Sequence, residues 1–437
     1  MSARIEPRTL KGFKDTMPGE ALVRNRMFRT IEGVFESFGY APIDTPALEY
    51  AEILRGKGGD ESDKQMFEFD DAGGRRVALR FDLTVPLARF VAEHQNDLAF
   101  PFRRYHIGPV WRGERPQKGR YREFYQCDAD LIGPTGPAAD AEILVMFSRV
   151  YAALGIEGVE VHVNDRRILN GLLDGLSIAD KAVPVLRALD KWDKVGADGV
   201  RKELEAAGVT GEAAAKVLAY PTALGATDDE TLANLEAMVG ANPKGREGVD
   251  AVRAVKALLA AAGVPTGAVR VDPTIARGLD YYTGMVWEAV IPSVPGFGSV
   301  GSGGRYDDLA GLYTNTKLPG VGCSVGVTRL LALLAESGRL STAAGTDGVL
   351  VTHPEDGDAT AAFALAAALR REGFAVETYP EPRKHAAQMK FADRKGLRFA
   401  VTIDPDGSIH GKDLRGKAVF TSPDAASAAD ELSRLRR

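Results

Sequence analysis

Residues 102–126 constrain the fold most strongly, because two strand-like segments flank a long polar connection there. Residues 105–111 are mostly apolar or aromatic, and residues 121–127 resume that character. The connection is rich in charged and turn-forming residues, namely Arg112, Glu114, Arg115, Pro116, Lys118, Gly119 and Arg120. A hairpin turn needs only about two to five residues. The longer cationic loop therefore predicts an anionic ligand, because the arginine fork suits phosphate and carboxylate oxygens. A solvated hairpin tip with ordinary surface charge explains the loop equally well.

The same stretch resembles the second signature motif of class II aminoacyl-tRNA synthetases. Within it, GPVWRGERPQKGRYREFYQ is similar to the form found in histidyl-tRNA synthetases. The matching residues are Arg112, Glu114, Arg120, Phe124 and Gln126. The resemblance implies that Arg112 bridges the substrate carboxylate and the α-phosphate of ATP. It also implies that Glu114 and Phe124 hold and stack adenine, while Arg120 binds the distal phosphates.

Composition limits the class of protein without naming its ligand. The 437 residues allow about three domains, and 45% hydrophobic with 26% charged residues is typical of a soluble globular enzyme. The net charge of −5 argues only weakly against nucleic acid, because an acidic body can carry a basic surface. Cys127 and Cys323 are far apart and lack metal-ligand spacing, so we expect small buried side chains and no metal site. The sequence has no apolar signal core or membrane-length run, so we expect a cytoplasmic protein without a membrane partner.

The N-terminal part predicts a helix followed by an extended segment. Residues 22–38 space apolar side chains three and four apart, and Gly39 follows in the usual C-terminal position. Pro42 and Pro46 then keep the chain extended. This arrangement resembles the first class II motif, which implies a homodimer interface. Any helix followed by an edge strand explains the segment equally well.

Asp82 and Thr84 follow a predicted hairpin formed by residues 65–71 and 75–80. An acid and a hydroxyl on one strand face can accept hydrogen bonds from an ammonium group. Either residue could instead cap the helix that we expect from Pro86 onward. The resemblance implies that both contact the α-amino group of histidine.

Period-two alternation places Gln126, Asp128 and Asp130 on one side of a strand. Three polar residues on one face are either exposed to solvent or line a pocket. By resemblance, Gln126 and Asp130 line the histidine pocket, with Gln126 near the ammonium group. Family members often carry Glu at position 130, and the shorter acid can still bond the imidazole.

Residues 276–288 (ARGLDYYTGMVWE) are similar to a histidine-specific motif of histidyl-tRNA synthetases, and residues 300–309 (VGSGGRYDDL) are similar to a second. Buried tyrosines need hydrogen-bond partners, and a polar imidazole pocket would supply them. Aromatic side chains that simply face the core are the alternative. The resemblance implies that Arg277 contacts histidine and the α-phosphate, and that Tyr282, with Tyr281 alongside, bonds the imidazole.

Residues 318–338 predict an apolar strand, a glycine and a helix with Arg329 in its first turn. An arginine there adds a cation where a helix N-terminus already favours anions. The segment resembles the third class II motif, which implies that Arg329 binds ATP. Thr328 is a departure, because the family usually carries Glu at this position.

The remaining segments define the expected domains. Ala/Leu-rich helical periodicity over residues 170–264 predicts an all-helical insertion. Residues 338–346 are small and polar, as in a linker, and residues 347–437 alternate as β-α-β-α-β, which predicts an α/β domain with a mostly parallel sheet. The fold class is therefore α+β, with the catalytic domain split into residues 1–169 and 265–337. By resemblance, its sheet is antiparallel and flanked by helices, the insertion reaches toward the tRNA acceptor arm, and the last domain binds the anticodon.

These resemblances together imply ATP-dependent attachment of L-histidine to tRNA(His) through histidyl-adenylate, with Mg²⁺ bridging phosphate oxygens of ATP. One alternative is the catalytically silent regulatory subunit of ATP phosphoribosyltransferase. That protein typically lacks the anticodon domain and catalytic positions, whereas residues 347–437, Arg112, Arg277 and Arg329 are present here. A pure tRNA-binding module would leave the histidine-specific stretches without a purpose.

Overall fold

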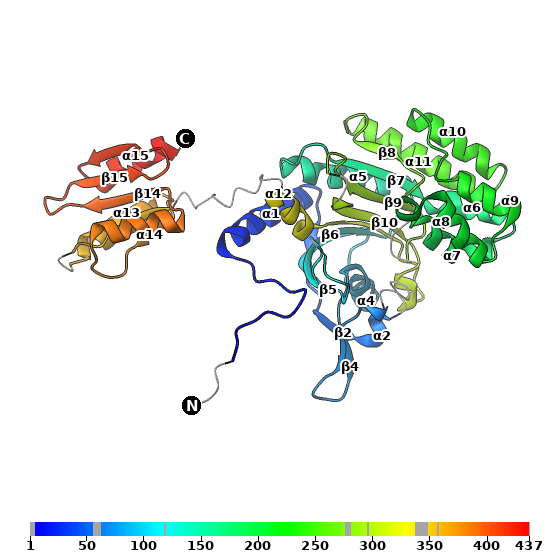
Figure 1. The fold of residues 1–437 in the computed structure, drawn as a ribbon, viewed down its shortest axis with the longest axis horizontal. Helices are drawn as coiled ribbons and strands as arrows, with labels where there is room; N and C mark the ends of the chain where they lie inside the picture. Colours follow the sequence, from blue (N-terminus) through cyan, green and yellow to red (C-terminus); the bar gives the residue numbers. More distant parts are fainter. Residues whose placement is uncertain are drawn as a thin grey trace. The chain divides into compact units, whose positions relative to one another are not determined.

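The computed structural model describes residues 5–55, 63–117, 119–275, 281–294, 297–336, 348–355 and 358–436. The chain divides into two compact units, a larger one that contains most residues before 337 and a smaller one that contains those after it. Figure 1 follows the elements of each unit along the sequence. None of the described helices is long and apolar enough to cross a bilayer.

An eight-stranded sheet forms the centre of the larger unit, in the order β1-β5-β6-β11-β10-β9-β7-β8. Its neighbours pair antiparallel except for β1 with β5 and β7 with β8, so the sheet is mainly antiparallel, as expected. The strands are β1 (Ala41–Pro42), β5 (Phe102–Trp111), β6 (Glu123–Ile132), β7 (Glu160–Asp165), β8 (Val269–Val271), β9 (Met285–Val290), β10 (Gly301–Tyr306) and β11 (Gly320–Val325).

Helices and a small second sheet accompany the central sheet. The helices are α1 (Pro18–Ser37), α2 (Ala51–Leu54), α4 (Thr84–His94), α5 (Pro137–Ala153), α12 (Val327–Glu336) and the 3-10 turn η3 (Ala310–Leu312). The small sheet has the order β2-β4-β3 and consists of β2 (Leu48–Tyr50), β3 (Glu68–Asp70) and β4 (Arg76–Leu79). The helix expected at residues 22–38 is therefore α1, and the predicted hairpin at residues 65–80 is β3 and β4.

Between β7 and β8 the chain is helical, and Figure 1 shows these helices gathered beside that edge of the sheet. Capping side chains explain where two of these helices begin. The Thr227 side chain accepts a hydrogen bond from the N–H of Glu230, and the Asn242 side chain accepts one from the N–H of Gly245. The elements are α6 (Arg166–Gly175), η1 (Ala179–Lys181), α7 (Ala182–Leu189), α8 (Trp192–Ala206), α9 (Gly211–Ala219), α10 (Asp228–Val239) and α11 (Pro243–Ala261). The boundaries at 170 and 264 stay a prediction.

The smaller unit contains a five-stranded sheet in the order β13-β12-β14-β15-β16. β12 pairs parallel with β13 and β14, which matches the predicted alternation, whereas β15 and β16 extend the sheet in antiparallel fashion. The elements are β12 (Val349–Val351), α13 (Thr360–Arg371), β13 (Val376–Thr378), α14 (His385–Lys395), β14 (Phe399–Ile403), β15 (Ile409–Asp413), β16 (Val419–Ser422) and α15 (Ala425–Arg436). The sequence analysis did not predict the last hairpin or α15.

Candidate active site

Two cavities in the larger unit contain the predicted site residues. The smaller cavity, of about 220 Å³, is lined by residues of β6, β9, β10, β11 and the start of α4. The larger cavity, of about 310 Å³, lies over the β5–β6 connection and the start of α12. Five residues line both, so the cavities adjoin: Arg112, Gln126, Glu288, Ser302 and Ser324. A broader cavity of about 560 Å³, lined among others by Phe38, Arg103 and Glu142, contains none of the predicted residues.

The β6 strand forms one wall of the smaller cavity. Gln126, Asp128 and Asp130 all line it, so the polar stripe of the sequence faces a pocket and not bulk solvent. The strand can pack closely against β11 because Gly322 pairs with Asp130 there. A Cβ atom at Gly322 would lie 2.0 Å from Asp130 Oδ1. This position therefore requires glycine.

The Asp130 carboxylate is held from two sides. Arg104 on β5 is fully buried, and its Nη2 lies 2.6 Å from Asp130 Oδ2. The Tyr306 hydroxyl donates a hydrogen bond to Asp130 Oδ1. Burial raises the pKa of Asp130, and the Arg104 charge and the Tyr306 hydroxyl oppose that rise. Asp130 therefore has two protein partners, an ion-pair partner and a hydrogen-bond donor.

Asp128 lies two residues earlier on the same face and has a different environment. Burial, aided by the negative charge of Asp130, raises the pKa of Asp128 to about 7, against the opposing effects of Arg104 and Ser324. Its Oδ1 atom is buried and has no hydrogen-bond partner among the described residues. The same holds for Gln126 Oε1 and Trp287 Nε1, which also line this cavity. Buried polar atoms are normally paired, so the cavity has the character of a site for a polar ligand.

Asp82 serves one of the two roles that the sequence left open, since it orders the start of a helix; binding of an ammonium group stays a prediction. Its Oδ1 accepts a hydrogen bond of 3.0 Å from the Val85 N–H in the first turn of α4, and its Oδ2 accepts one of 3.1 Å from the Tyr281 hydroxyl. Burial raises the pKa of Asp82, while the Val85 N–H and the nearby Arg112 charge lower it. Asp82 and Thr84 also line the smaller cavity. The carboxylate therefore orders the helix start and a tyrosine at once.

Aromatic rings close the opposite side of the smaller cavity. Tyr281 and Tyr282 pack edge to face with centroids 5.1 Å apart, and Tyr281 packs likewise on Tyr306 at 5.9 Å. Tyr281 and Tyr282 also pack against a buried apolar cluster, so they face both the pocket and the core. A Cβ atom at Gly304 would lie 2.8 Å from the Tyr282 ring. The dense glycines of β10 thus let an aromatic ring lie directly on the strand.

Several arginine side chains line the larger cavity. The Arg112 guanidinium lies over the Phe124 ring at 5.2 Å, and its Nε donates to the Phe81 carbonyl at 3.0 Å. Glu114 lies 3.9 Å from Arg112 and 3.4 Å from Arg120.

Arg329, on α12, lies across this cavity from the β5–β6 connection and donates a short hydrogen bond to the Ser299 carbonyl. Burial lowers the pKa of Arg329, and the charges of Arg120 and Arg112 lower it further. The effect of Arg120 and Arg112 on this pKa places their charges within interaction range of Arg329. All three side chains line the cavity, so they face a common space. An anionic ligand would relieve their repulsion.

The described structure brings eleven of the twelve predicted residues into these two cavities. The smaller cavity contains Asp82, Thr84, Asp130, Tyr281 and Tyr282, the larger contains Glu114, Arg120, Phe124 and Arg329, and Arg112 and Gln126 line both. Arg277 lies outside the described residues. The departing residue, Thr328, lines the larger cavity and accepts a hydrogen bond of 2.9 Å from the Tyr125 N–H.

Sequence reasoning missed several residues that form the walls. Alternation placed Asp128 on the same strand face as Gln126 and Asp130, but it was not selected, and Tyr306 lay within a recognised motif. Arg104 carried no local signal, because only the pairing of β5 with β6 brings it opposite Asp130. The other missed residues are Trp287, Glu288, Ser302, Cys323 and Ser324.

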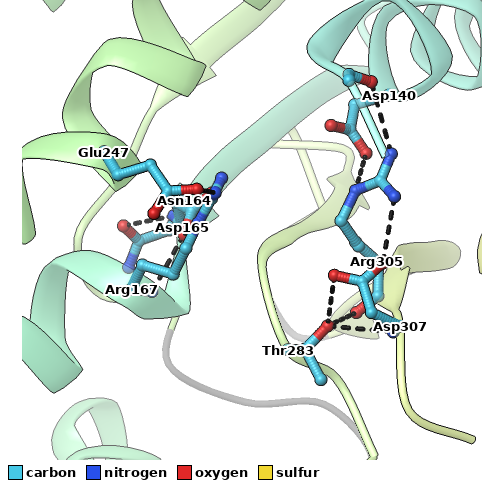
Figure 2. Close-up of polar contacts among 9 residues, drawn as sticks. Asp140, Asn164, Asp165, Arg167, Glu247, Thr283, Arg305 and Asp307 are labelled. Carbon is cyan, nitrogen blue, oxygen red and sulfur yellow. Dashed lines mark hydrogen bonds and ion pairs between the residues drawn. The ribbon is translucent and has the colours of Figure 1, made fainter. Parts of the chain in front are cut away.

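Polar contacts fix the chain next to the two tyrosines, and Figure 2 shows those among Asp140, Thr283, Arg305 and Asp307. Arg305 on β10 donates to Asp140 at 2.9 Å and to Asp307 at 3.1 Å, and Asp307 in turn accepts from the Thr283 hydroxyl at 3.2 Å. Thr283 directly follows Tyr282, so this network anchors the tyrosine segment to α5.

A second network in Figure 2 joins the base of the helical segment to the site. Arg167 pairs with Asp165 at 2.7 Å and with Glu247 on α11 at 2.6 Å. Its neighbour Arg166 donates to the Tyr282 carbonyl at 2.9 Å. The first turn of α6 therefore holds both α11 and the tyrosine segment.

Cys127 and Cys323 are both buried, as predicted, and their thiols are free. No group of three or more His, Cys, Asp or Glu residues in the described ranges could hold a metal ion.

Comparisons with known proteins agree with this geometry. A family profile described as histidyl-tRNA synthetase matches residues 12–330. A histidine–tRNA ligase of Rhodopirellula baltica is 49% identical over 405 residues, which cover 92% of this chain and 91% of the relative. The crystal structure of histidyl-tRNA synthetase from Nostoc sp. PCC 7120 superimposes with a TM-score of 0.86 at 31% identity, covering 99% of this chain and 100% of that one.

A second solved structure bears on the alternative function. It is titled as an ATP phosphoribosyltransferase regulatory subunit/histidyl-tRNA synthetase from Bacillus halodurans, and it matches with a TM-score of 0.73 at 23% identity over 86% of this chain and 93% of that one. At that identity the likeness shows the fold alone, so it gives the regulatory alternative no better support than the ligase. By its profile match and its close relatives, the chain belongs to the histidyl-tRNA synthetase family.

Proposed function

We propose that the two adjoining cavities hold histidine and ATP, and that the chain uses them to attach histidine to tRNA(His). The observation that carries the proposal is the position of Arg112, which lines both cavities. A guanidinium at that junction can bind a carboxylate on one side and a phosphate on the other.

Histidine occupies the smaller cavity. Asp82, Thr84 and Gln126 supply acceptors for its ammonium group, and the unpartnered Gln126 Oε1 supports that role. Asp130 and Tyr282, with Tyr281 alongside, face the imidazole. A site that demands polar contacts from the ring rejects amino acids of similar size that lack them.

ATP occupies the larger cavity. Phe124 stacks on adenine and Glu114 accepts from its amino group, while Arg120 and Arg329 bind the distal phosphates. The lowered pKa of Arg329, caused first by burial and then by the charges of Arg120 and Arg112, supports this assignment, because a polyanion would neutralise the three guanidinium groups.

The reaction has two steps. An oxygen of the histidine carboxylate attacks the α-phosphorus, the bond to the bridging oxygen breaks, and pyrophosphate leaves. The terminal ribose hydroxyl of tRNA then attacks the acyl carbon and AMP leaves. Alignment and charge stabilisation dominate the first step. Arg112 supplies both at the junction of the cavities, and Arg277 is assigned a similar role on the α-phosphate by the family resemblance alone.

Mg²⁺ enters as part of the nucleotide substrate. Magnesium is usually bound by phosphates, water and one or two carboxylates. Glu288 lines the larger cavity and fits that limited contribution. The ion would neutralise charge on the β- and γ-phosphates.

Several finer assignments rest on the family resemblance. These are the homodimer, the cytoplasmic location, the approach of residues 170–264 to the acceptor arm, and anticodon binding by residues 347–437. The cavities do not bear on them.

ATP–pyrophosphate exchange with each of the standard amino acids tests the proposal. We expect exchange with histidine and background rates with the others. Exchange with no amino acid would favour the regulatory subunit, and aminoacylation of tRNA(His) would follow as the second measurement.

A further inference from the structure

We propose that Asp128 is a further specificity-determining residue, whose Oδ1 accepts the N–H of the substrate's imidazole ring. This inference rests on the proposed function, because it takes the smaller cavity as the histidine site. It adds a second carboxylate, on the same strand face, to the contact proposed for Asp130.

The partners of Asp130 limit its availability. One oxygen lies 2.6 Å from the buried Arg104 guanidinium, and the other accepts the Tyr306 hydroxyl. Asp130 Oδ1 is therefore engaged in a hydrogen bond, whereas Oδ2 is paired with Arg104 by charge and has no hydrogen-bond partner among the described residues. Asp130 thus orients Tyr306 and neutralises Arg104 in addition to any contact with the ring.

Asp128 differs from Asp130 in having no ion pair with a described residue, although its side chain bonds Ser324. It lines the same cavity, it is only 2% exposed, and its Oδ1 has no hydrogen-bond partner among the described residues. A buried acceptor without a partner destabilises the structure, and more so when it is charged. A ligand that brings an N–H donor removes that cost, whereas a ligand without one retains it.

The imidazole ring fits this arrangement chemically. In its neutral form it carries one N–H donor and one nitrogen acceptor. An ionised carboxylate is an acceptor only, and a tyrosine hydroxyl can donate. Asp128 and Tyr282 line the same cavity, so together they can match both ring nitrogens.

Steady-state exchange assays on Asp128→Asn give the first test. A hydrogen bond to a charged group contributes about 1.5–3 kcal/mol, so we expect KM for histidine to rise about 10- to 100-fold. KM for ATP should change less than about twofold. The matched control is Glu123→Gln, which neutralises an exposed acid on the same strand, outside both cavities. Equal KM values for histidine in Asp128→Asn and the control would overturn the proposal.

A double-mutant cycle that combines Asp128→Asn with altered substrates gives a measurement that a purely structural role of Asp128 would not change. The probes are thiazol-4-ylalanine and thiazol-5-ylalanine, in each of which sulfur replaces one ring nitrogen, with binding measured by calorimetry. We expect at least one isomer to bind wild type tenfold or more weakly than histidine, and that penalty to shrink severalfold in Asp128→Asn. An identical penalty in both proteins would remove Asp128 as the acceptor.

The two proposals fail in distinguishable ways. If wild type shows no histidine-dependent exchange, the proposed function fails whatever Asp128 does. If wild type exchanges normally and Asp128→Asn matches it, only the inference about Asp128 fails.

Discussion

Arg104 and Asp130 form a buried ion pair across neighbouring strands, with Arg104 Nη2 2.6 Å from Asp130 Oδ2. The two residues are direct partners in the β5–β6 register. Arg104 has no exposed surface and Asp130 is 2% exposed. If one partner were removed, bulk water could not solvate the charge that remains. The pair therefore fixes the β6 wall of the smaller cavity. Each charge depends on the other for its stabilisation.

The first prediction is that Asp130→Asn destabilises the larger unit. Removing one partner of a buried pair typically costs about 3–5 kcal/mol, because the remaining charge stays buried and unpaired. Urea unfolding followed by circular dichroism measures the loss. The double variant Arg104→Met with Asp130→Asn should recover part of it, since no buried charge then remains. A single variant as stable as wild type would show that Arg104 finds another partner.

The second prediction concerns Asp128, whose pKa is raised from 3.8 to about 7 by burial and by Asp130. Below about pH 4 the carboxyl is protonated in the folded and unfolded chain alike, so it costs the fold nothing. Above about pH 7 it is ionised in both, and burial then penalises only the folded state, by on the order of 4 kcal/mol. Asp128→Asn lacks this titration. The variant should therefore gain stability relative to wild type as pH rises from 4 to 7.

Thermal unfolding of both proteins between pH 4 and 8 measures the difference. The other groups that act on Asp128 are Asp130, Arg104, Ser324 and Asp82, and all of them are retained in the variant. A difference in melting temperature that does not depend on pH would contradict the raised pKa. Higher stability together with weaker histidine binding would show that lost activity in Asp128→Asn does not come from misfolding.

Local patterns were sufficient to predict much of this fold. Apolar spacing predicted α1, alternation predicted the polar face of β6, and motif resemblance selected residues from distant segments that share the two cavities. Local patterns do not show which polar atoms have a hydrogen-bond or ion-pair partner. Which of Asp128 and Asp130 has an ion-pair partner depends on the β5–β6 register that places Arg104 opposite Asp130, and that register is a long-range property.

The missed hairpin of the smaller unit has a similar explanation. The buried positions of β15 are Ile409, Gly411 and Asp413. Only one of them carries a large apolar side chain, so the sequence shows no alternation of apolar and polar residues. Gly411 is required because a Cβ atom there would lie 2.0 Å from the Phe420 ring. A close cross-strand packing that depends on glycine leaves no hydrophobic period to detect.

The third prediction uses the glycines of β10. In Gly304→Ala the new methyl group would lie 2.8 Å from the Tyr282 ring and 2.9 Å from the Met285 carbonyl, so the ring or the strand must move. We expect KM for histidine to rise at least severalfold in the exchange assay. Gly311→Ala is the matched control, because nothing lies within 4 Å of its added Cβ atom. If both variants keep wild-type KM values, Tyr282 does not shape the histidine site.

The fourth prediction separates the two cavities through their arginines. Arg112 lines both cavities and Arg329 lines only the larger one. Arg329→Ala should therefore raise KM for ATP and leave the Kd for histidine, measured without ATP, within about twofold of wild type. Arg112→Ala should weaken histidine binding as well, and should lower kcat for exchange by about 100-fold or more, because it removes a charge aligned with the reacting groups.

Arg112→Lys sharpens this comparison. Lysine keeps the positive charge but has no planar fork, so it cannot bind a carboxylate and a phosphate through paired parallel hydrogen bonds. If charge alone matters at the junction of the cavities, Arg112→Lys should approach wild-type kcat. If bridging geometry matters, as the position over the Phe124 ring and the hydrogen bond to Phe81 indicate, kcat should stay close to that of Arg112→Ala. Equal effects of Arg112→Ala and Arg329→Ala on histidine affinity would contradict the assignment of Arg112 to both substrates.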